Sequence, residues 1–304
     1  MGRKGKIVAT DLSPYAPALC FADKFYLVPK ITEDSYIDVL LDVCRKEKIQ
    51  AVFTLIDPEI AILSENRKKF EDLGIKVFVP FYETAKICFD KFEMYKYLVK
   101  CQIPTVTTYG SLEDFLLDYN TDKIHFPVFV KPRTGSGSIG ARRIENLDDL
   151  QIAMSEDSSL IIQEFMDGID LDADVYVDSV SGEVVSAFSK KKISTTIGGA
   201  NKTISFKDDK LFEFIKRVAS VLNLYGPNDM DFFYRDGRYY LSEINPRFGG
   251  AYLHAYGAGV DFIKLIENNI SEISNKPNLG DYSDNIVMMM YDAVVIKRQE
   301  DLLS

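Results

Sequence analysis

Short apolar runs alternate with helical patterns over the first part of the chain. Residues 6–10 and 51–55 are apolar runs of strand length, whereas residues 36–47 repeat apolar side chains at helical spacing. Such alternation is typical of a parallel sheet built from βα units. We predict a small doubly wound domain, with strands at 6–10, 26–28, 51–55 and 76–79 and helices at 36–47 and 59–73.

This first domain lacks the unit with which doubly wound domains begin. Such domains start with a strand, a glycine-rich turn and a helix, but this chain starts at what reads as the second strand. We interpret the difference as a truncation, with natural loss of the first βα unit as the alternative. We assign residues 1–84 to this domain and residues 85–304 to a second one.

The second part of the chain predicts antiparallel sheets. Residues 230–234 and 239–244 flank Asp236-Gly237, a turn pair that favours a two-residue β-hairpin. We predict further strands at 126–131, 140–144, 160–165, 173–178 and 184–189, and helices at 83–100, 111–119, 147–154, 208–222 and 260–268. The overall class is therefore α/β, with an α+β second domain and a separate lobe at about residues 122–190.

Composition narrows the classes of function. The formal net charge of −10 argues against a general nucleic-acid binder, which needs a clustered basic surface. No apolar run reaches the roughly 18 residues of a membrane-spanning helix. The cysteines form no CxxC pair and the two histidines complete no zinc set, so we expect reduced thiols and a cytoplasmic location.

A glycine-rich loop follows the apolar strand at residues 126–131. Its sequence matches the GxGxxG pattern of dinucleotide-binding proteins, but that pattern needs a helix to begin within it. Residues 141–144 read as a returning strand instead, so the loop caps a hairpin. The backbone and hydroxyl groups of such a loop can still bind phosphate, and the candidates are Gly135, Ser136, Gly137, Ser138 and Gly140.

A lysine ends the strand before this loop. Lys131 follows Val-Phe-Val, and a buried, unpaired lysine is costly. Lys131 therefore either extends to solvent or pairs with an anion. We favour phosphate binding at this loop over the alternative that the loop is only an exposed hairpin.

Acidic and amide side chains gather on the hairpin around Asp236-Gly237. Glu243 and Asn245 are two residues apart, so they share a face of one strand, and Asp231 on the other strand can lie opposite them. Their apolar neighbours imply burial, although acids on hairpins are usually solvated. An all-oxygen set suits Mg²⁺. Arg247 follows in the sequence. We expect its guanidinium either to bind a carboxylate or phosphoryl oxygen, or to form a salt bridge to Glu243 alone.

Four motifs in this order resemble the ATP-grasp superfamily, especially carbamoyl phosphate synthase large-subunit-like carboxylate–amine ligases. They are Asp90-Lys91, residues 129–132 with the glycine loop, residues 162–168, and residues 243–250 with the upstream Asp231. The resemblance covers nearly the whole chain. It implies a two-lobed domain in which residues 135–140 close over the triphosphate.

The resemblance also implies nucleotide contacts. Lys91 and Lys131 would contact ATP phosphates, and a hinge would read adenine through residues Glu164, Phe165 and Met166. Asp170 would contact the ribose hydroxyls, although the family more often has glutamate there.

Metal and catalytic roles follow from the same resemblance. Asp231, Glu243 and Asn245 would hold one or two Mg²⁺, with Mn²⁺ as an alternative, although Asp231 is one methylene shorter than the commoner glutamate. Arg247 would stabilise an acyl phosphate or bind the substrate carboxylate, and Lys202 would reach the γ-phosphate.

We therefore predict an ATP- and Mg²⁺-dependent ligase that activates a carboxylate as an acyl phosphate for attack by an amine. Its partners would be small-molecule substrates, with no nucleic acid and no membrane. A homodimer or a partner subunit is left open. The alternatives are a non-catalytic ATP-binding subunit, a kinase, and an NAD-binding oxidoreductase that depends on the glycine loop.

Overall fold

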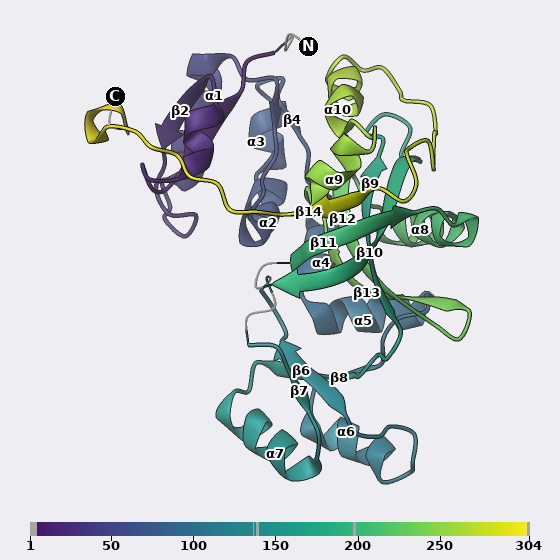
Figure 1. The fold of residues 1–304 in the computed structure, drawn as a ribbon. Helices are drawn as coiled ribbons and strands as arrows, with labels where there is room; N and C mark the ends of the chain where they lie inside the picture. The colour runs from purple at the N-terminus through teal and green to yellow at the C-terminus, as the bar shows by residue number, and fades with distance from the viewer. Residues whose placement is uncertain (1–4, 136, 138–139, 197–198, 303–304) are drawn as a thin grey trace. The chain divides into compact units, whose positions relative to one another are not determined.

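The computed structural model describes residues 5–135, 137, 140–196 and 199–302 of the 304-residue chain (Figure 1). The chain divides into two compact units. The first comprises residues 1–52, 66–77 and 290–304, and the second comprises residues 53–65 and 78–289. The predicted domain boundary at residues 84–85 and the lobe limits of 122–190 stay predictions.

The first unit contains two pairs of parallel strands. Strand β1 (Val8–Asp11) pairs with β2 (Lys24–Leu27), and β3 (Ala51–Val52) pairs with β4 (Lys76–Val77). The helical segments of this unit are η1 (Pro17–Phe21), α1 (Tyr36–Glu47), α3 (Arg67–Glu71) and η2 (Gln299–Leu302). The parallel pairing and the limits of α1 are as predicted from the sequence.

The single helix predicted over residues 59–73 is wrong. The structure divides it into α2 (Asp57–Glu65), which belongs to the second unit, and α3. Asn66 leaves helical geometry between them, with φ −95° and ψ 8°. Asparagine side chains compete for backbone hydrogen bonds, which favours such breaks.

A six-stranded antiparallel sheet dominates the second unit (Figure 1). Its strands lie in the order β13-β12-β9-β10-β11-β14. Their bounds are β9 (Ile169–Val177), β10 (Val184–Thr196), β11 (Gly199–Phe206), β12 (Gly226–Arg235), β13 (Arg238–Asn245) and β14 (Val287–Met289). The predicted hairpin around Asp236-Gly237 joins β12 to β13, and β11 and β14 are strands that the sequence pattern did not predict.

Helix α8 (Asp209–Leu222) packs against β10. It begins after Asp208, whose side chain accepts a hydrogen bond from the Lys210 backbone N–H and so caps the helix. Its buried side chains recur at helical spacing, as the sequence predicted: Leu211, Phe212, Ile215, Val218, Ala219 and Leu222. Two helices lie between β13 and β14 in the chain: α9 (Tyr252–Gly257), which was not predicted, and α10 (Phe262–Ile270).

A four-stranded sheet forms a separate part of the second unit. Its strand order is β5-β8-β6-β7, with β5 (Thr108–Tyr109), β6 (Val128–Pro132), β7 (Arg142–Ile144) and β8 (Leu160–Glu164). Helices α6 (Leu112–Tyr119) and α7 (Leu147–Glu156) accompany it. Phe115 and Leu150, both fully buried, bring the two helices into one core with the sheet. Ser111 caps α6, because its hydroxyl oxygen accepts a hydrogen bond from the Asp114 N–H.

The helix predicted over residues 83–100 is also two helices, α4 (Tyr82–Phe89) and α5 (Lys91–Lys100). The Asp90 carboxylate accepts hydrogen bonds from the Phe92 and Glu93 N–H groups. Asp90 therefore acts as the N-cap of a new helix rather than as an interior residue. The break places Lys91 in the first turn of α5.

Asp178, just beyond β9, is a buried carboxylate with a structural role. It accepts hydrogen bonds from the Ser181 N–H, from the Asn269 side chain and from both the N–H and the side chain of Asn275. Burial raises the pKa of Asp178, but these donors outweigh it and lower the pKa from 3.8 to about 2. The carboxylate form is therefore favoured by folding.

We expect Asp178→Asn to lower the free energy of unfolding by about 2 kcal/mol at pH 7. Because the folded pKa lies below the unfolded one, this contribution is complete above about pH 4 and disappears as the pH falls towards 2. Urea denaturation of the wild type and the variant at pH 7 and pH 2.5 measures it. A stability difference that does not shrink at the lower pH would contradict this explanation.

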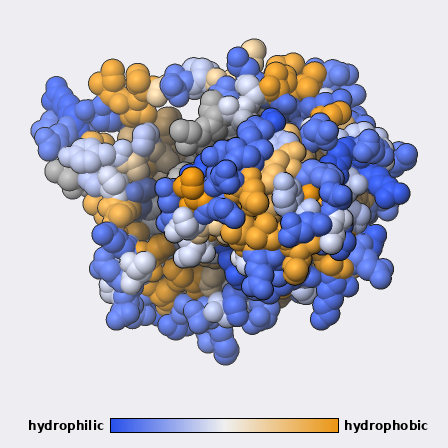
Figure 2. Space-filling model, turned by 90° about the horizontal axis from the view of Figure 1, so that it is seen from below, coloured by the Kyte–Doolittle hydropathy of each residue, from blue (hydrophilic) through white to orange (hydrophobic). Residues whose placement is uncertain are grey.

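The surface carries scattered apolar side chains. On the face shown in Figure 2, hydrophilic residues separate the hydrophobic ones into small groups, as is common for proteins in water. None of the helices in the described part of the chain has the length and apolar character needed to cross a membrane.

Candidate functional site

Strands β12 and β13 bring acidic side chains face to face. Asp231 lies directly opposite Glu243, and Asp229 lies directly opposite Asn245. Directly paired residues project from the same face of a sheet. The sequence-based expectation that Asp231, Glu243 and Asn245 share one face is therefore met, and Asp229 joins them.

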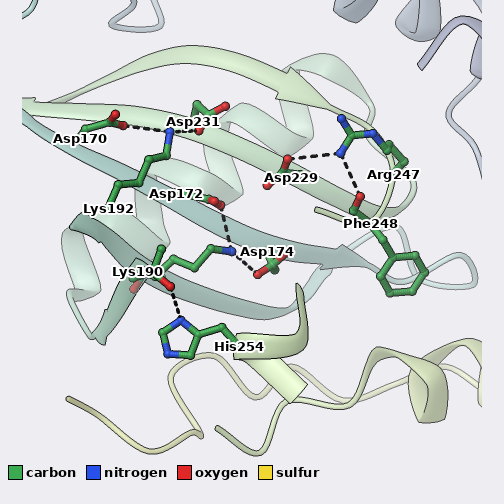
Figure 3. A network of polar contacts seen from close by, with 12 residues as sticks. Asp170, Asp172, Asp174, Lys190, Lys192, Asp229, Asp231, Arg247, Phe248 and His254 are labelled. Atoms are coloured by element: carbon green, nitrogen blue, oxygen red, sulfur yellow. Dashed lines mark hydrogen bonds and ion pairs between the residues drawn. The ribbon is translucent and has the colours of Figure 1, made fainter. Parts of the chain in front are cut away.

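Strand β9 adds three further aspartates to this face. Asp172 is paired with Asp231 and Asp174 with Asp229, and alternation along the strand adds Asp170 (Figure 3). Of these three aspartates, only Asp170 was predicted from the sequence to belong to the site. The signal that could have identified the others is the alternating Asp-x-Asp-x-Asp pattern of residues 170–174.

Two lysines of β10 neutralise part of this negative charge. Lys192 Nζ lies 3.0 Å from Asp170 and also pairs with Asp231. Lys190 is fully buried; its Nζ lies 3.1 Å from Asp172 and also pairs with Asp174. Burial lowers the pKa of Lys190, but Asp172 and Asp174 more than offset this, so its pKa is raised and the side chain stays charged.

Both lysines that were predicted to bind phosphate lie close to the Glu243 carboxylate. Lys91 Nζ lies 3.9 Å and Lys131 Nζ 3.6 Å from its carboxylate oxygens. Lys91 also donates to the Gly135 carbonyl, at the start of the glycine loop. Burial lowers the pKa of Lys91, Glu243 raises it and Lys131 lowers it, with a net decrease. Because its Nζ lies 3.6 Å from Glu243, Lys131 pairs with an anion, the Glu243 carboxylate, rather than extending to solvent.

The glycine loop joins two antiparallel strands, β6 and β7. The GxGxxG pattern is thus not followed by a helix, and the dinucleotide-binding interpretation of this loop is wrong. Gly135, Gly137 and Gly140 have φ of 99°, 74° and 75°, which L side chains rarely adopt. Two other predicted phosphate contacts, Ser136 and Ser138, lie outside the described residues.

Arg247 binds two aspartates that the sequence did not assign to it. Its guanidinium forms a fork with Asp57, at 2.7 and 3.0 Å, and lies 3.4 Å from Asp229. It also donates to the Phe248 carbonyl. The alternative of a salt bridge to Glu243 alone is wrong, because these two aspartates are the partners of Arg247. Burial lowers its pKa, but Asp57 and Asp229 raise it overall.

The predicted hinge follows β8. Glu164 pairs with Arg235 at 2.6 Å, and the Arg143 guanidinium lies over the Phe165 ring at 4.5 Å. Met166 is buried. The adenine-reading role of these three residues stays a prediction.

Lys202 does not join the carboxylate face. It is exposed on β11 beside the buried Thr203, and neighbouring strand residues project to opposite faces. Thr203 is paired with Lys192, so it is Thr203 that shares the side of the acidic cluster. Lys192 was missed because the strand predicted at residues 184–189 ends before it, whereas β10 extends to Thr196.

A pocket lies at this site. Its walls include the following polar side chains: Asp57, Lys91, Glu243 and Asn245. It also includes the backbone at Gly135. The pocket thus joins the carboxylate hairpin to the start of the glycine loop.

The oxygen donors suit a hard cation. Asp231, Glu243 and Asn245 offer two carboxylates and an amide, the ligand type that Mg²⁺ prefers. Within the described ranges, no three His, Cys, Asp or Glu side chains converge as a metal site. A cation here would therefore need the amide of Asn245, and ligand oxygens such as those of a phosphate, to complete its coordination. With that completion, the residues fit Mg²⁺.

Comparison with protein families agrees with this geometry. An ATP-grasp domain matches residues 88–251, and a PylC-like, N-terminal domain matches residues 1–78. The first match covers more than half of the 304 residues. This chain belongs to the ATP-grasp family.

Curated relatives share parts of the chain. The D-alanine–D-alanine ligase of Lactococcus lactis subsp. cremoris is 31% identical over 144 residues, which are 41% of each protein. The carbamoyl phosphate synthase large chain of a Thermoanaerobacter species is 24% identical over 266 residues, 80% of this chain but 23% of that protein. The chain thus spans less than half of either relative.

A solved structure shows the same fold. The biotin carboxylase domain dimer of Hydrogenobacter thermophilus 2-oxoglutarate carboxylase, in complex with MgADP, ADP and bicarbonate, superposes with a TM-score of 0.72. The similarity covers 92% of this chain and 67% of that chain at 17% identity. At this identity the likeness extends to the fold alone.

Proposed function

We propose that this protein is an ATP- and Mg²⁺-dependent ligase that activates a carboxylate as an acyl phosphate for attack by an amine. The observation that carries the proposal is the hairpin on which Asp231 faces Glu243, with Asn245 two residues along. Lys91 and Lys131 converge on the same Glu243. Carboxylates that hold a metal beside lysines that hold phosphates are the requirements of phosphoryl transfer.

The nucleotide would occupy the pocket between hairpin and glycine loop. Lys91 and Lys131 would turn from Glu243 to the phosphates once a cation takes over that carboxylate. Gly135, Gly137 and Gly140 would let the loop backbone approach the triphosphate closely. The hinge after β8 would hold adenine, and Asp170 the ribose.

Asp231, Glu243 and Asn245 would hold Mg²⁺, or Mn²⁺ in its place, and the bound cation would supply positive charge that offsets the charge of the transferred phosphoryl group. Arg247 would then orient the substrate carboxylate, because Asp57 and Asp229 hold its guanidinium in place. The carboxylate oxygen would attack the γ-phosphorus in line and displace ADP. The neutral amine would then attack the carbonyl carbon of the acyl phosphate, displace phosphate and lose a proton. Closure of the loop would exclude water from the acyl phosphate.

Lys192 is better placed than Lys202 to stabilise the transferred phosphoryl group. Its ammonium already bridges Asp170 and the proposed metal ligand Asp231. We expect Lys192→Met to lower ATP-dependent phosphate release by about 100-fold or more and Lys202→Met to change it less than about twofold. Steady-state phosphate release by the two variants is the measurement. A larger loss of phosphate release in Lys202→Met than in Lys192→Met would assign this role to Lys202 instead.

A screen of small carboxylates and amino acids for ATP-dependent phosphate release tests the proposed function. Release that requires both a carboxylate and an amine supports a ligase. ADP formation without an amine, together with a stable phosphorylated product, indicates a kinase. Nucleotide binding without any turnover indicates a non-catalytic subunit. This alternative agrees with the finding that the chain spans less than half of either relative.

A further inference from the structure

Arg133, the residue that directly follows β6, directs its side chain to one turn of a neighbouring helix. Its Nε donates to both carboxylate oxygens of Asp90, at 2.8 and 2.7 Å, and its Nη2 donates to Glu93 at 2.9 Å. The guanidinium also lies 5.5 Å from the centre of the Phe92 ring. Asp90 caps α5, and the other two partners lie in its first turn.

The backbone of Arg133 makes the same connection. Its carbonyl accepts a hydrogen bond from the Lys91 N–H at 3.0 Å, and its own N–H donates to the Ser159 carbonyl at 2.9 Å. Ser159 directly precedes β8. Residue 133 therefore joins the four-stranded sheet to the start of α5 through both its backbone and its side chain.

Helix α5 has its cap without this arginine. The Asp90 carboxylate already accepts from the Phe92 and Glu93 N–H groups, and Lys96 neutralises Glu93 at 2.7 Å. The Arg133 side chain is 40% exposed, and exposed ion pairs contribute little to stability. The stability of the helix therefore does not explain why one guanidinium makes three hydrogen bonds to the same turn.

The turn that Arg133 holds carries Lys91. The Lys91 side chain is buried and lines the pocket together with Gly135 and Glu243. Its Nζ donates to the Gly135 carbonyl and lies 3.9 Å from Glu243. Because Gly135 is two residues after Arg133, a shift of this turn relative to the end of β6 would move the Lys91 ammonium away from the pocket.

We propose that Arg133 is a positioning residue for nucleotide binding, which holds the first turn of α5 against the end of β6 so that Lys91 reaches the pocket. The inference rests on the ligase function proposed above and adds a residue outside the predicted site. Arginine suits this role because its planar guanidinium presents fixed donors to two carboxylates at once. A lysine whose backbone is already fixed loses less freedom when it binds an anion.

Direct contact between Arg133 and phosphate is the rival role. The described lining of the pocket includes Gly135 but not Arg133. A phosphate would also have to compete with Asp90 and Glu93 for the donors of the guanidinium. Positioning through Asp90 is therefore the role that the contacts favour.

Acetylation by limiting acetic anhydride, quantified for each lysine by mass spectrometry, tests the position of Lys91 without nucleotide. Lys91 is 8% exposed, and we expect Arg133→Met to raise its acetylation rate by about threefold or more. The rate of the exposed Lys216 on α8 should stay the same, and the melting temperature should change by less than about 2 °C. An unchanged Lys91 rate in Arg133→Met overturns the inference.

Arg142→Met is the matched control for this measurement. Arg142 is a partly exposed arginine of the same sheet, and its guanidinium lies 3.9 Å from Glu156. Its replacement should leave the acetylation rate of Lys91 unchanged. An equal increase in Arg142→Met would show that any lost surface charge has this effect, and it would overturn the inference as well.

Calorimetric titration with MgATP separates positioning from direct phosphate contact. We expect Arg133→Met to raise the Kd about 10-fold. Asp90→Asn keeps a good N-cap but removes the charge that Arg133 binds, so it should raise the Kd by a similar factor. The double variant should bind no more weakly than the weaker single variant.

Direct contact predicts a different pattern. Loss of the Asp90 carboxylate would then leave MgATP binding unchanged or strengthen it, because a negative charge near the phosphates is removed. That result overturns the positioning role.

The outcomes also separate the inference from the proposed function. MgATP binding that weakens in Arg133→Met, without turnover of any carboxylate and amine, supports the inference and overturns the ligase function. A wild-type protein that does not bind MgATP overturns the proposed function, and the acetylation rates still decide whether Arg133 holds Lys91 in place.

Discussion

Replacing Glu243 with glutamine is expected to lower ATP-dependent phosphate release by about 1,000-fold. Glu243 faces Asp231 across the hairpin and receives both Lys91 and Lys131. The amide keeps the size of the side chain but removes the charge that a cation and two lysines share. Both the proposed metal site and the positions of the two lysines should therefore be disturbed.

Glu183→Gln serves as the control for this prediction. Glu183 is an exposed glutamate between β9 and β10, away from the acidic face, so its variant should retain wild-type turnover. Circular dichroism and thermal melting establish that Glu243→Gln is folded. A folded Glu243→Gln variant with wild-type phosphate release would rule out the assigned role of the hairpin.

Lys190→Met is expected to lower the free energy of unfolding by about 3–5 kcal/mol. The ammonium group is fully buried between Asp172 and Asp174. Methionine has a similar length but no charge, so two carboxylates would be left buried beside each other without a counter-ion. Urea denaturation at pH 7 measures the loss.

A second substitution tests whether charge is the cause. Asp174→Asn removes one of the two carboxylates, so the Lys190→Met/Asp174→Asn double variant should lose less stability than the sum of the two single variants. Lys191→Met, at the adjacent exposed position, should change stability by less than about 1 kcal/mol. Additive losses, or an equal loss for Lys191→Met, would show that packing rather than charge explains the effect.

The carboxylate hairpin could be predicted because the residues that determine it are close together in the sequence. Asp236-Gly237 fixes the turn, and the alternation of side chains on each strand puts Glu243 and Asn245 on one face. The exact partner of Asp231 depends on a bulge that the sequence did not predict. The pairs nearest the turn, such as Phe232 with Leu241, would continue to Asp231 opposite Ser242, and the bulge between Asp231 and Phe232 shifts the register by one residue so that Asp231 faces Glu243.

The contacts between the remaining acidic side chains and their basic partners could not be predicted from the sequence. Asp172 and Lys190 are close because β9 pairs with β10 in a particular register, and a shift of one residue would turn either side chain to the other face. Arg247 meets Asp57, which lies 190 positions earlier in the chain. Such contacts depend on tertiary structure, and no local pattern specifies them.

Helix breaks were missed for a different reason. Asp90 and Asn66 lie within stretches whose apolar spacing continues a helical pattern. The Asp90 side chain nevertheless caps a new helix, and the Asn66 backbone leaves helical geometry. The break at Asp90 has consequences for the site, because it brings Lys91 to the first turn of α5 and from there to Glu243. Short polar residues within a helical pattern are thus candidate breaks as well as surface positions.

Calorimetric titration of the protein with ATP, in the presence and absence of Mg²⁺, tests the central claim most directly. We predict saturable binding of one nucleotide that is stronger with Mg²⁺, and a marked loss of that Mg²⁺-dependent gain in the Glu243→Gln variant. Absence of nucleotide binding by the folded protein with Mg²⁺ present, or binding that Glu243→Gln leaves unchanged, would contradict it.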